Sequence, residues 1–272
     1  MKNNIPVLNV AYSPCPNDTF MFHDIATQAL SLPLYHTETH LHDIQTLNEK
    51  ALSEEFDITK LSIHAYLQVR ETYCLLNSGA ALGHGCGPIV VTKQDNTIDD
   101  LAECTIAIPG DLTTAHLMFR LWSPNAHKRV FMPFDRIMQS VLQGQVDAGV
   151  IIHEGRFVYQ QLGLKRLVDL GQWWQDQTSM PLPLGCIAAR RSLGKETIAA
   201  FDELLKQSIA NALAEPLKTL SYVRDNAQEM DETVLQKHIT TFVNDFSVDM
   251  GPEGRRAIEA LEERAIKAGI LQ

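Results

Sequence analysis

The sequence has few cysteines and no long apolar segment. Its five cysteines, at positions 15, 74, 86, 104 and 186, are odd in number and scattered, with no CxxC pair, so reduced thiols are the simplest interpretation. No stretch approaches the roughly 20 apolar residues that cross a bilayer, and the first residues, Met-Lys-Asn-Asn-Ile-Pro, lack a signal-peptide pattern. We therefore expect a cytoplasmic protein with no membrane insertion.

Positive charge is also scarce. The chain has 23 Lys and Arg against 33 Asp and Glu, a formal net charge of -10 at pH 7, and no basic cluster stands out. A surface for nucleic acid or anionic membrane needs a local basic patch, so neither partner is expected. A small anionic organic molecule remains possible, because a cleft can supply local donors inside an acidic protein. The sequence does not set the oligomeric state.

Short apolar runs alternate with helical patterns along the 272 residues, which is typical of βαβ units and a mostly parallel sheet. We predict strands over 7–12, 56–63, 104–108 and 146–152, with an extended segment over 32–44. Helices are predicted over 20–30, 46–55, 65–71, 113–122 and 134–143. The chain after residue 189 is expected to be helical, most clearly over 196–214, 217–229 and 253–268.

A weak internal similarity indicates two lobes built on one plan. Segments 52–58 and 141–148 each end a helix and place an aspartate before a strand. Segments 83–92 and 183–189 are expected to cross between the lobes. We therefore predict an α/β fold in which residues 1–92 and 187–272 form a discontinuous first lobe and residues 93–186 the second, with the ligand beyond the carboxyl ends of the strands.

Two strand-turn-helix junctions are candidate ligand contacts. They are Ser13 to Phe20 in the first lobe and Gly110 to Ala115 in the second. A helix start offers unpaired N–H groups and the positive end of its dipole, which favour a carboxylate or a phosphate. Helix capping alone is the alternative at both junctions, although it explains one of the paired threonines, Thr113 and Thr114, better than both.

His153 is the candidate chemical group. It follows the strand Gly149 to Ile152, where the fold places a ligand, and imidazole suits acid–base work near neutral pH. A purely structural histidine is the alternative, since the chain has ten histidines.

Two further patterns are less favoured. His36, Glu38, His40 and His42 alternate on one predicted strand, but their spacing fits no tight metal site, and a polar solvent-facing strand explains them better. Cys15 precedes a helix start, where the pKa of a thiol can fall. With no base adjacent in sequence, a structural role is preferred to a nucleophilic one.

Five motifs in fixed order carry a resemblance. They are Ser-Pro-Cys-Pro-Asn-Asp-Thr-Phe at 13–20, Lys-Leu-Ser at 60–62, Gly-Cys-Gly-Pro at 85–88, Thr-Thr-Ala at 113–115 and His-Glu-Gly at 153–155. Together they resemble the 1,4-dihydroxy-6-naphthoate synthase family of the futalosine route to menaquinone. The resemblance covers the whole chain, with no departure at these positions.

The resemblance implies a periplasmic-binding-protein type II fold and a lyase that acts without a metal or an organic cofactor. It implies conversion of cyclic dehypoxanthine futalosine to 1,4-dihydroxy-6-naphthoate. The catalytic histidine of the family falls on His153, and its substrate-contacting segments fall on Lys60, Leu61 and Ser62 and on Thr114 and Ala115.

Two alternative functions stay open. Chorismate dehydratase of the same pathway is expected to share the fold, and a non-catalytic binding protein for a small anionic solute would too, because a fold does not fix a function. The sequence also leaves open whether Asn17, Asp18, Asn48 and Thr113 touch a ligand or only shape the cleft.

Overall fold

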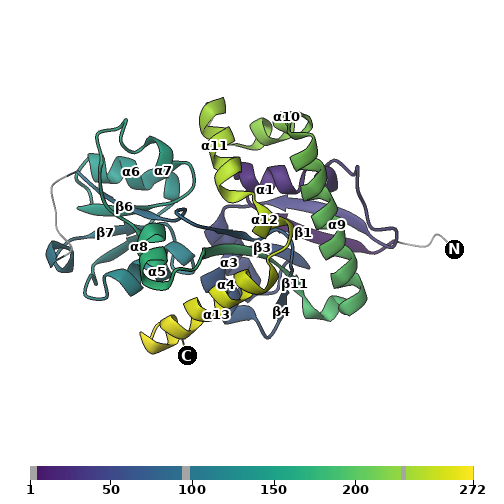
Figure 1. Cartoon of the computed structure of the whole chain (residues 1–272), viewed down its shortest axis with the longest axis horizontal. Coiled ribbons are helices and arrows are strands. Elements are labelled where there is room, and N and C mark those ends of the chain that lie inside the picture. The colour runs from purple at the N-terminus through teal and green to yellow at the C-terminus, as the bar shows by residue number, and fades with distance from the viewer. Residues whose placement is uncertain (1–4, 94–98, 228–230, 272) are drawn as a thin grey trace.

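A computed structural model of the chain describes residues 5–93, 99–227 and 231–271. Two β-sheets lie end to end along the long axis, each with its own helices (Figure 1). We call the sheet that contains the first strand, with its helices, the first lobe, and the other sheet with its helices the second lobe. The predicted two-lobed α/β architecture is confirmed.

The first sheet has the strand order β2-β1-β3-β11-β4, with β5 also paired to β11. Strand β1 is parallel to β2 and β3, whereas β11 is antiparallel to β3, β4 and β5. The strands are β1 (Val7–Tyr12), β2 (His36–Leu41), β3 (Ile58–Ser62), β4 (Tyr73–Leu75), β5 (Ala81–Gly83) and β11 (Leu182–Arg190).

The second sheet has the order β10-β6-β9-β7-β8. Strand β7 is parallel to β8 and β9, and β6 is antiparallel to β9 and β10. The strands are β6 (Ile89–Thr92), β7 (Ile106–Ile108), β8 (Arg129–Phe131), β9 (Ala148–Ile151) and β10 (Lys165–Asp169). Both sheets are therefore more mixed than the alternating pattern predicts, because β6 and β11, the strands next to the two crossings, run against their neighbours.

Helices flank both sheets and dominate the C-terminal part of the chain (Figure 1). Those of the first lobe are α1 (Pro16–Met21), α2 (His23–Ala26), α3 (Ile44–Leu52), α4 (Ile63–Val69), α9 (Lys195–Ala214), α10 (Pro216–Asn226), α11 (Glu232–Phe242), α12 (Asp245–Val248) and α13 (Gly251–Lys267). Those of the second lobe are α5 (Thr114–Trp122), α6 (Phe134–Leu142), α7 (Gly155–Val158) and α8 (Leu170–Thr178), and short 3-10 turns cover Asp99–Ala102 and Arg191–Leu193. Residues 228 and 229 of the predicted helix 217–229 lie outside the described residues. Within those residues, no helix has the length and apolarity needed to cross a bilayer.

Local sequence explains where the first helices begin and end. Pro16 occupies the first turn of α1, where its fixed φ and missing N–H cost nothing, so the helix starts at residue 16 rather than at the predicted 20. Helix α2 ends at Ala26, shortly before Gln28 takes a left-handed φ of 59°. Helix α3 begins after Asp43, whose carboxylate accepts hydrogen bonds from two backbone N–H groups.

The two aspartates of the internal similarity make the same contacts in both lobes. Asp57 accepts a hydrogen bond from the backbone N–H of Asn9 and donates its own N–H to the Asn9 carbonyl. Asp147 does the same with Thr105, at 2.7 Å for the carboxylate and 2.9 Å for the carbonyl. In each lobe the aspartate that precedes one strand is thus bonded twice to the backbone of a residue in or next to the parallel neighbour, which supports one shared plan.

Strand pairing assigns the strands beside the two crossings to one sheet or the other. The predicted lobes, 1–92 with 187–272 and 93–186, assign β6 to the first lobe and the start of β11 to the second. Strand pairing instead puts β6 in the second sheet and the whole of β11 in the first. The lobe boundaries at 92 and 186 stay a prediction.

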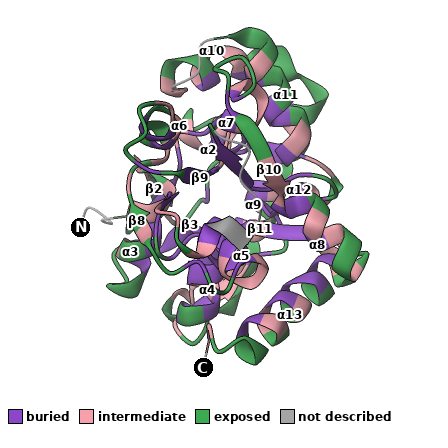
Figure 2. Ribbon diagram, turned by 90° about the vertical axis from the view of Figure 1, so that its left-hand side faces the viewer, coloured by how far each residue is buried: buried purple, intermediate pink, exposed green. Residues whose placement is uncertain are grey.

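The core is continuous through the junction of the lobes. One cluster of buried apolar side chains includes Leu61 and Ile63 of the first lobe with Val90 and Ile106 of the second. Separate clusters fill the outer face of each sheet. Figure 2 shows the strands mostly buried and the outer faces of α10 and α11 exposed. The junction is therefore packed on one side and open to the cleft on the other.

Candidate active site

A cavity of about 670 Å³, open to solvent, lies between the lobes. It is bounded by the carboxyl ends of β1, β3 and β9 and by the starts of α1, α3 and α5. Its walls contain Ser13, Asn17, Asp18, Ile44, Lys60, Ser62, Ala81, Gly87, Pro88, Thr113, Thr114, Ala115, Ile152, His153, Leu184, Gly185, His238 and Phe242.

Leu61 is the member of the predicted site that does not reach the cavity. Side chains alternate along a strand, so Lys60 and Ser62 face the cleft while Leu61 points to the opposite face. Leu61 is completely buried in the core that joins the two lobes. The other five predicted residues all line the cavity.

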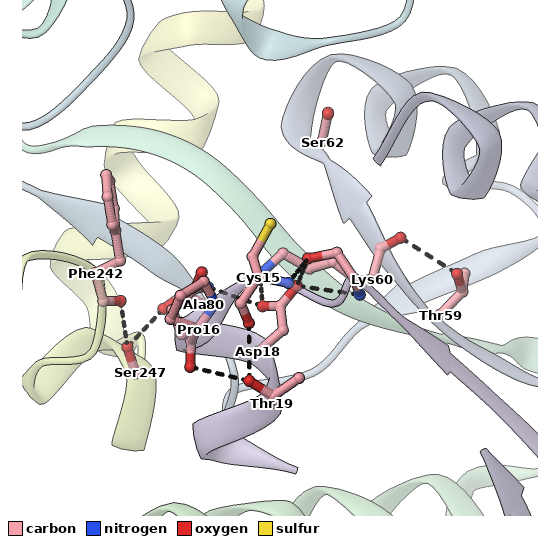
Figure 3. Close-up of polar contacts among 12 residues, drawn as sticks. Cys15, Pro16, Asp18, Thr19, Thr59, Lys60, Ser62, Ala80, Phe242 and Ser247 are labelled. Atoms are coloured by element: carbon pink, nitrogen blue, oxygen red, sulfur yellow. Dashed lines mark hydrogen bonds and ion pairs between the residues drawn. The ribbon is translucent and has the colours of Figure 1, made fainter. Parts of the chain in front are cut away.

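Asp18 is the centre of the first-lobe wall. Its carboxylate accepts hydrogen bonds from the Ser13 hydroxyl at 2.6 Å and from the Asn17 amide at 2.8 Å. It also forms a buried ion pair with Lys60, with Nζ and Oδ1 2.6 Å apart (Figure 3). Because both side chains are buried, the charge of Lys60 is balanced within the wall itself.

Ser62 is held by Asn48, a fully buried residue of α3. The Asn48 amide donates to the Ser62 hydroxyl oxygen at 3.0 Å, and the Ser62 N–H donates to the Asn48 carbonyl oxygen at 2.9 Å. A hydroxyl that already accepts a hydrogen bond keeps its own hydrogen for another partner. The Ser62 O–H can therefore donate into the cavity.

The start of α5 forms the facing wall in the second lobe. Thr113 caps the helix, since its hydroxyl oxygen accepts from the His116 N–H at 3.2 Å. The Thr114 hydroxyl donates to the Leu184 carbonyl at 2.7 Å and thereby ties the two lobes together. The first N–H groups of a helix have no intrahelical acceptor, so those of Thr114 and Ala115 are suited to an anion.

His153 follows β9 and faces the cavity. Its backbone has a left-handed φ of 55°, an uncommon conformation for a residue with a side chain. The ring lies edge-on to Phe134, with centroids 4.7 Å apart. Burial is the main cause that lowers the pKa of His153 to about 4; the negative charge of Asp18 opposes this effect and the positive charge of Lys60 adds to it. The imidazole is therefore neutral at physiological pH.

Cys15 touches His153 from the first lobe. Its Sγ lies 3.3 Å from Nδ1 of the ring, although the two residues are 138 positions apart. Burial, together with the negative charge of Asp18, raises the pKa of the Cys15 thiol above its ordinary value. Cys15 is also not among the described residues that line the cavity. The structure thus supplies the base that the sequence does not place beside Cys15, but keeps the thiol protonated and away from the open space.

His238 and Phe242 of α11 were not predicted for the site. Both line the cavity, and Nε2 of His238 lies 2.9 Å from the Asn17 Oδ1. The ring of His238 is stacked on that of His153, with centroids 6.1 Å apart and planes 11° apart. The sequence has a helical pattern over residues 232–242. That pattern indicates a helix but does not show that the helix packs against the cleft.

The alternating polar residues of β2 lie away from the cavity. Nε2 of His40 lies 3.0 Å from the side-chain amide oxygen of Asn9, and the ring of His42, just after β2, packs at a tilt against that of Phe56. In the described ranges, no three His, Cys, Asp or Glu side chains are grouped so that they could hold a metal ion.

Comparison with known proteins places the chain in a family. A profile of the menaquinone biosynthesis family matches residues 8–267. A 1,4-dihydroxy-6-naphthoate synthase from Thermus thermophilus is 44% identical over 263 residues, which are 97% of this chain and 95% of the relative. A protein of the same name from Streptomyces coelicolor is 40% identical over 270 residues, 97% of this chain and 94% of the relative.

Solved structures agree with the fold. An Archaeoglobus fulgidus protein is 37% identical, with a TM-score of 0.92, and the match covers 97% of this chain and 98% of that chain. A Candida albicans protein described as having the generic periplasmic binding protein fold has a TM-score of 0.73 at 15% identity, covering 98% of this chain and 91% of the other. The periplasmic-binding-protein-like fold is therefore confirmed. With the family profile and both relatives matching nearly its full length, the chain belongs to the menaquinone biosynthesis family and is an enzyme of that pathway.

Proposed function

We propose that the enzyme is a lyase that converts cyclic dehypoxanthine futalosine to 1,4-dihydroxy-6-naphthoate, with His153 as its general base. The observation that carries the proposal is the neutral imidazole of His153 in the wall of the interlobe cavity, facing the donors of both lobes. A neutral imidazole can accept a proton, which is what a general base must do. The names of the two relatives support the choice of product.

The anionic part of the substrate binds, in this proposal, between Ser62 and the start of α5. The Ser62 hydroxyl donates from the first lobe, and the N–H groups of Thr114 and Ala115 donate from the second. The helix dipole adds favourable electrostatic interaction at this position. Lys60 contributes positive potential to the same wall but remains paired with Asp18.

The reaction starts when His153 takes a proton from the sugar-derived ring of the substrate, which begins elimination and aromatisation. Binding of a negatively charged substrate raises the pKa of His153 and so strengthens the base when it is needed. Closure of the lobes removes water from the reacting groups. General base catalysis of this kind contributes about 10² to 10⁴ in rate.

The test is incubation of the purified, chelator-treated full chain with cyclic dehypoxanthine futalosine, followed by mass-resolved chromatography. We expect 1,4-dihydroxy-6-naphthoate to appear, with no metal or organic cofactor added. Unchanged substrate in the presence of folded protein contradicts the proposal. Chorismate would then be assayed for dehydration, and tight binding of either compound without turnover would indicate a binding protein.

A further inference from the structure

His238 lies beside the proposed base, although no step of the proposed reaction uses it. It belongs to α11 of the first lobe, is 1% exposed and lines the cavity. His153 and Glu154, which face it, follow β9 of the second lobe. The contacts of His238 therefore cross the cleft.

The hydrogen bonds around Asn17 fix the proton of His238. The Asn17 amide nitrogen donates to the Asp18 carboxylate at 2.8 Å, so the Asn17 carbonyl oxygen must be the atom that faces His238. A carbonyl oxygen only accepts, so Nε2 of His238 must donate. In the neutral ring the proton then sits on Nε2, and Nδ1 is left as an acceptor.

Among the described residues, no hydrogen-bond donor reaches Nδ1 of His238. It is buried and has no hydrogen-bond partner among the residues that the structure describes. Oε2 of Glu154 lies 4.0 Å from this nitrogen. Both atoms are acceptors, so they cannot bond to each other until one of them carries a proton. Buried polar atoms without a partner are rare in folded proteins and call for a reason.

If Nδ1 of His238 carried a proton, it could donate a charged hydrogen bond to Oε2 of Glu154. Such bonds are typically about 2.7–2.9 Å long and stronger than neutral ones. Burial is the main cause that lowers the pKa of His238. The positive charge of Lys60, and that of His153 whenever its ring is protonated, act in the same direction. The groups that face His238 from α1, β3 and the turn after β9 are Asn17, Lys60, His153 and Glu154.

We propose that His238 and Glu154 are positioning residues for His153, which form an interlobe hydrogen bond when one of them carries a proton. The bond holds the turn that carries His153 against the first lobe. The left-handed backbone of His153 makes that turn one that needs support from its surroundings. The inference rests on the proposed role of His153, but the contact itself can be measured without turnover.

The first test is Glu154→Gln. A glutamine amide donates to Nδ1 of neutral His238 without an added proton, so the variant has the contact at every pH. Because a permanent bond favours the closed cleft, we expect a KM roughly two- to ten-fold lower, a lower kcat through slower product release, and a flatter dependence of KM on pH. Glu259→Gln, at an exposed position of α13, is the matched control and should behave as the wild type.

The coupling between the two residues is the decisive comparison. In a His238→Phe background, which keeps a flat ring but no nitrogen, Glu154→Gln should leave KM unchanged. An equal KM effect of Glu154→Gln with and without His238 would overturn the proposal, as would no effect in the wild-type background.

The second test needs no substrate. Nitrogen-15 NMR of histidine-labelled full chain at neutral pH should show His238 protonated on Nε2 and unprotonated on Nδ1, with the Nδ1 signal shifted in Glu154→Gln. A neutral His238 ring with its proton on Nδ1 and none on Nε2 would overturn the inference, because Nε2 could not then donate to Asn17. The expected NMR pattern in a chain that fails to convert cyclic dehypoxanthine futalosine would overturn the proposed function alone.

Discussion

The imidazole of His153 combines a low pKa with a place in the cavity wall. Since its pKa is about 4 in the free enzyme, the ring can accept a proton at any pH above about 5. We expect kcat/KM to be flat towards neutral pH and to fall as the pH drops below about 5. The acid limb of kcat should lie at higher pH, because bound anionic substrate raises the pKa of His153. Steady-state rates over this pH range measure both limbs.

Removal of the His153 ring gives the direct test of its role. His153→Ala should lower kcat by about 10² to 10⁴ while circular dichroism shows a folded protein. His127→Ala, at an exposed histidine outside the cavity, serves as the control. Nearly full turnover by His153→Ala would remove the general-base assignment.

Both side chains of the Lys60–Asp18 ion pair are buried, so removal of one partner leaves an unbalanced buried charge. Lys60→Met is expected to lower the free energy of unfolding by roughly 3–5 kcal/mol. Adding Asp18→Asn should recover part of this loss, because the remaining amide carries no charge. Urea unfolding of the two single variants and the double variant measures the coupling, and strictly additive losses would contradict it.

Among single residues, the sequence predicts those that a motif marks and misses those that only the folded chain brings together. Lys60, Ser62 and His153 stand in motifs and line the cavity. Leu61 shares a motif with Lys60, but strand alternation turns it into the core. His238 reaches Asn17 across 221 positions, a distance that no local pattern spans.

At the scale of elements, the crossing between β5 and β6 is tightly held. Arg156 of the second lobe donates to the carbonyls of Gly85 and Gly87 and pairs with Asp169. On the other side α8 comes so close that a Cβ on Gly171 would lie 2.1 Å from the Cys86 carbonyl oxygen. Only a glycine permits this approach between backbones. The segment predicted to cross between the lobes is thus held by contacts on two sides.

We therefore expect Gly171→Ala to push α8 away from the crossing. The overpacking should lower the free energy of unfolding by about 1–3 kcal/mol and also raise KM, since Gly87 and Pro88 line the cavity. Denaturant unfolding and steady-state rates measure the two effects. Gln177→Ala, at an exposed position of the same helix, should change neither. Wild-type stability of Gly171→Ala would show that α8 can move without cost.

The type and order of most elements were predictable, whereas strand direction was not. Apolar runs and helical periodicity mark β1, β3, β9 and α9 close to their observed bounds. The antiparallel pairing of β6 and β11 is set by how the chain crosses between lobes, which is a long-range feature. Helix α11, which brings His238 to the cleft, is not resolved as a separate element by the pattern after residue 189.

At the scale of the whole molecule, the two lobes meet through polar contacts that depend on protonation. His64 of α4 lies against Thr113 of α5, with Nδ1 3.3 Å from the Thr113 carbonyl oxygen. Burial is the main cause that lowers the pKa of His64 to about 4. With His153 and His238, three histidines near the cleft are therefore held neutral by the fold. Protonation of any of them places a positive charge where the surroundings oppose it.

These histidines predict that acid destabilises the folded chain. An unfolded histidine titrates near 6.5 and the folded ones lower, so between those pH values the unfolded state binds more protons. Stability is then complete above about pH 6.5 and is lost as the pH falls towards 4. The loss reaches up to about 3 kcal/mol for His64 alone. Urea unfolding at pH 7 and pH 5 should show the lower free energy at pH 5.

The His64→Leu variant measures how much of the acid destabilisation comes from His64. The variant loses the hydrogen bond to the Thr113 carbonyl, so it should be less stable than the wild type at pH 7. It also has one titrating group fewer, so its free energy of unfolding should fall less between pH 7 and pH 5. The difference between the two slopes is the contribution of His64, because a change common to both proteins cancels. Parallel slopes would mean that His64 already titrates in the folded chain as it does in the unfolded one, and that the α4–α5 contact tolerates its charge.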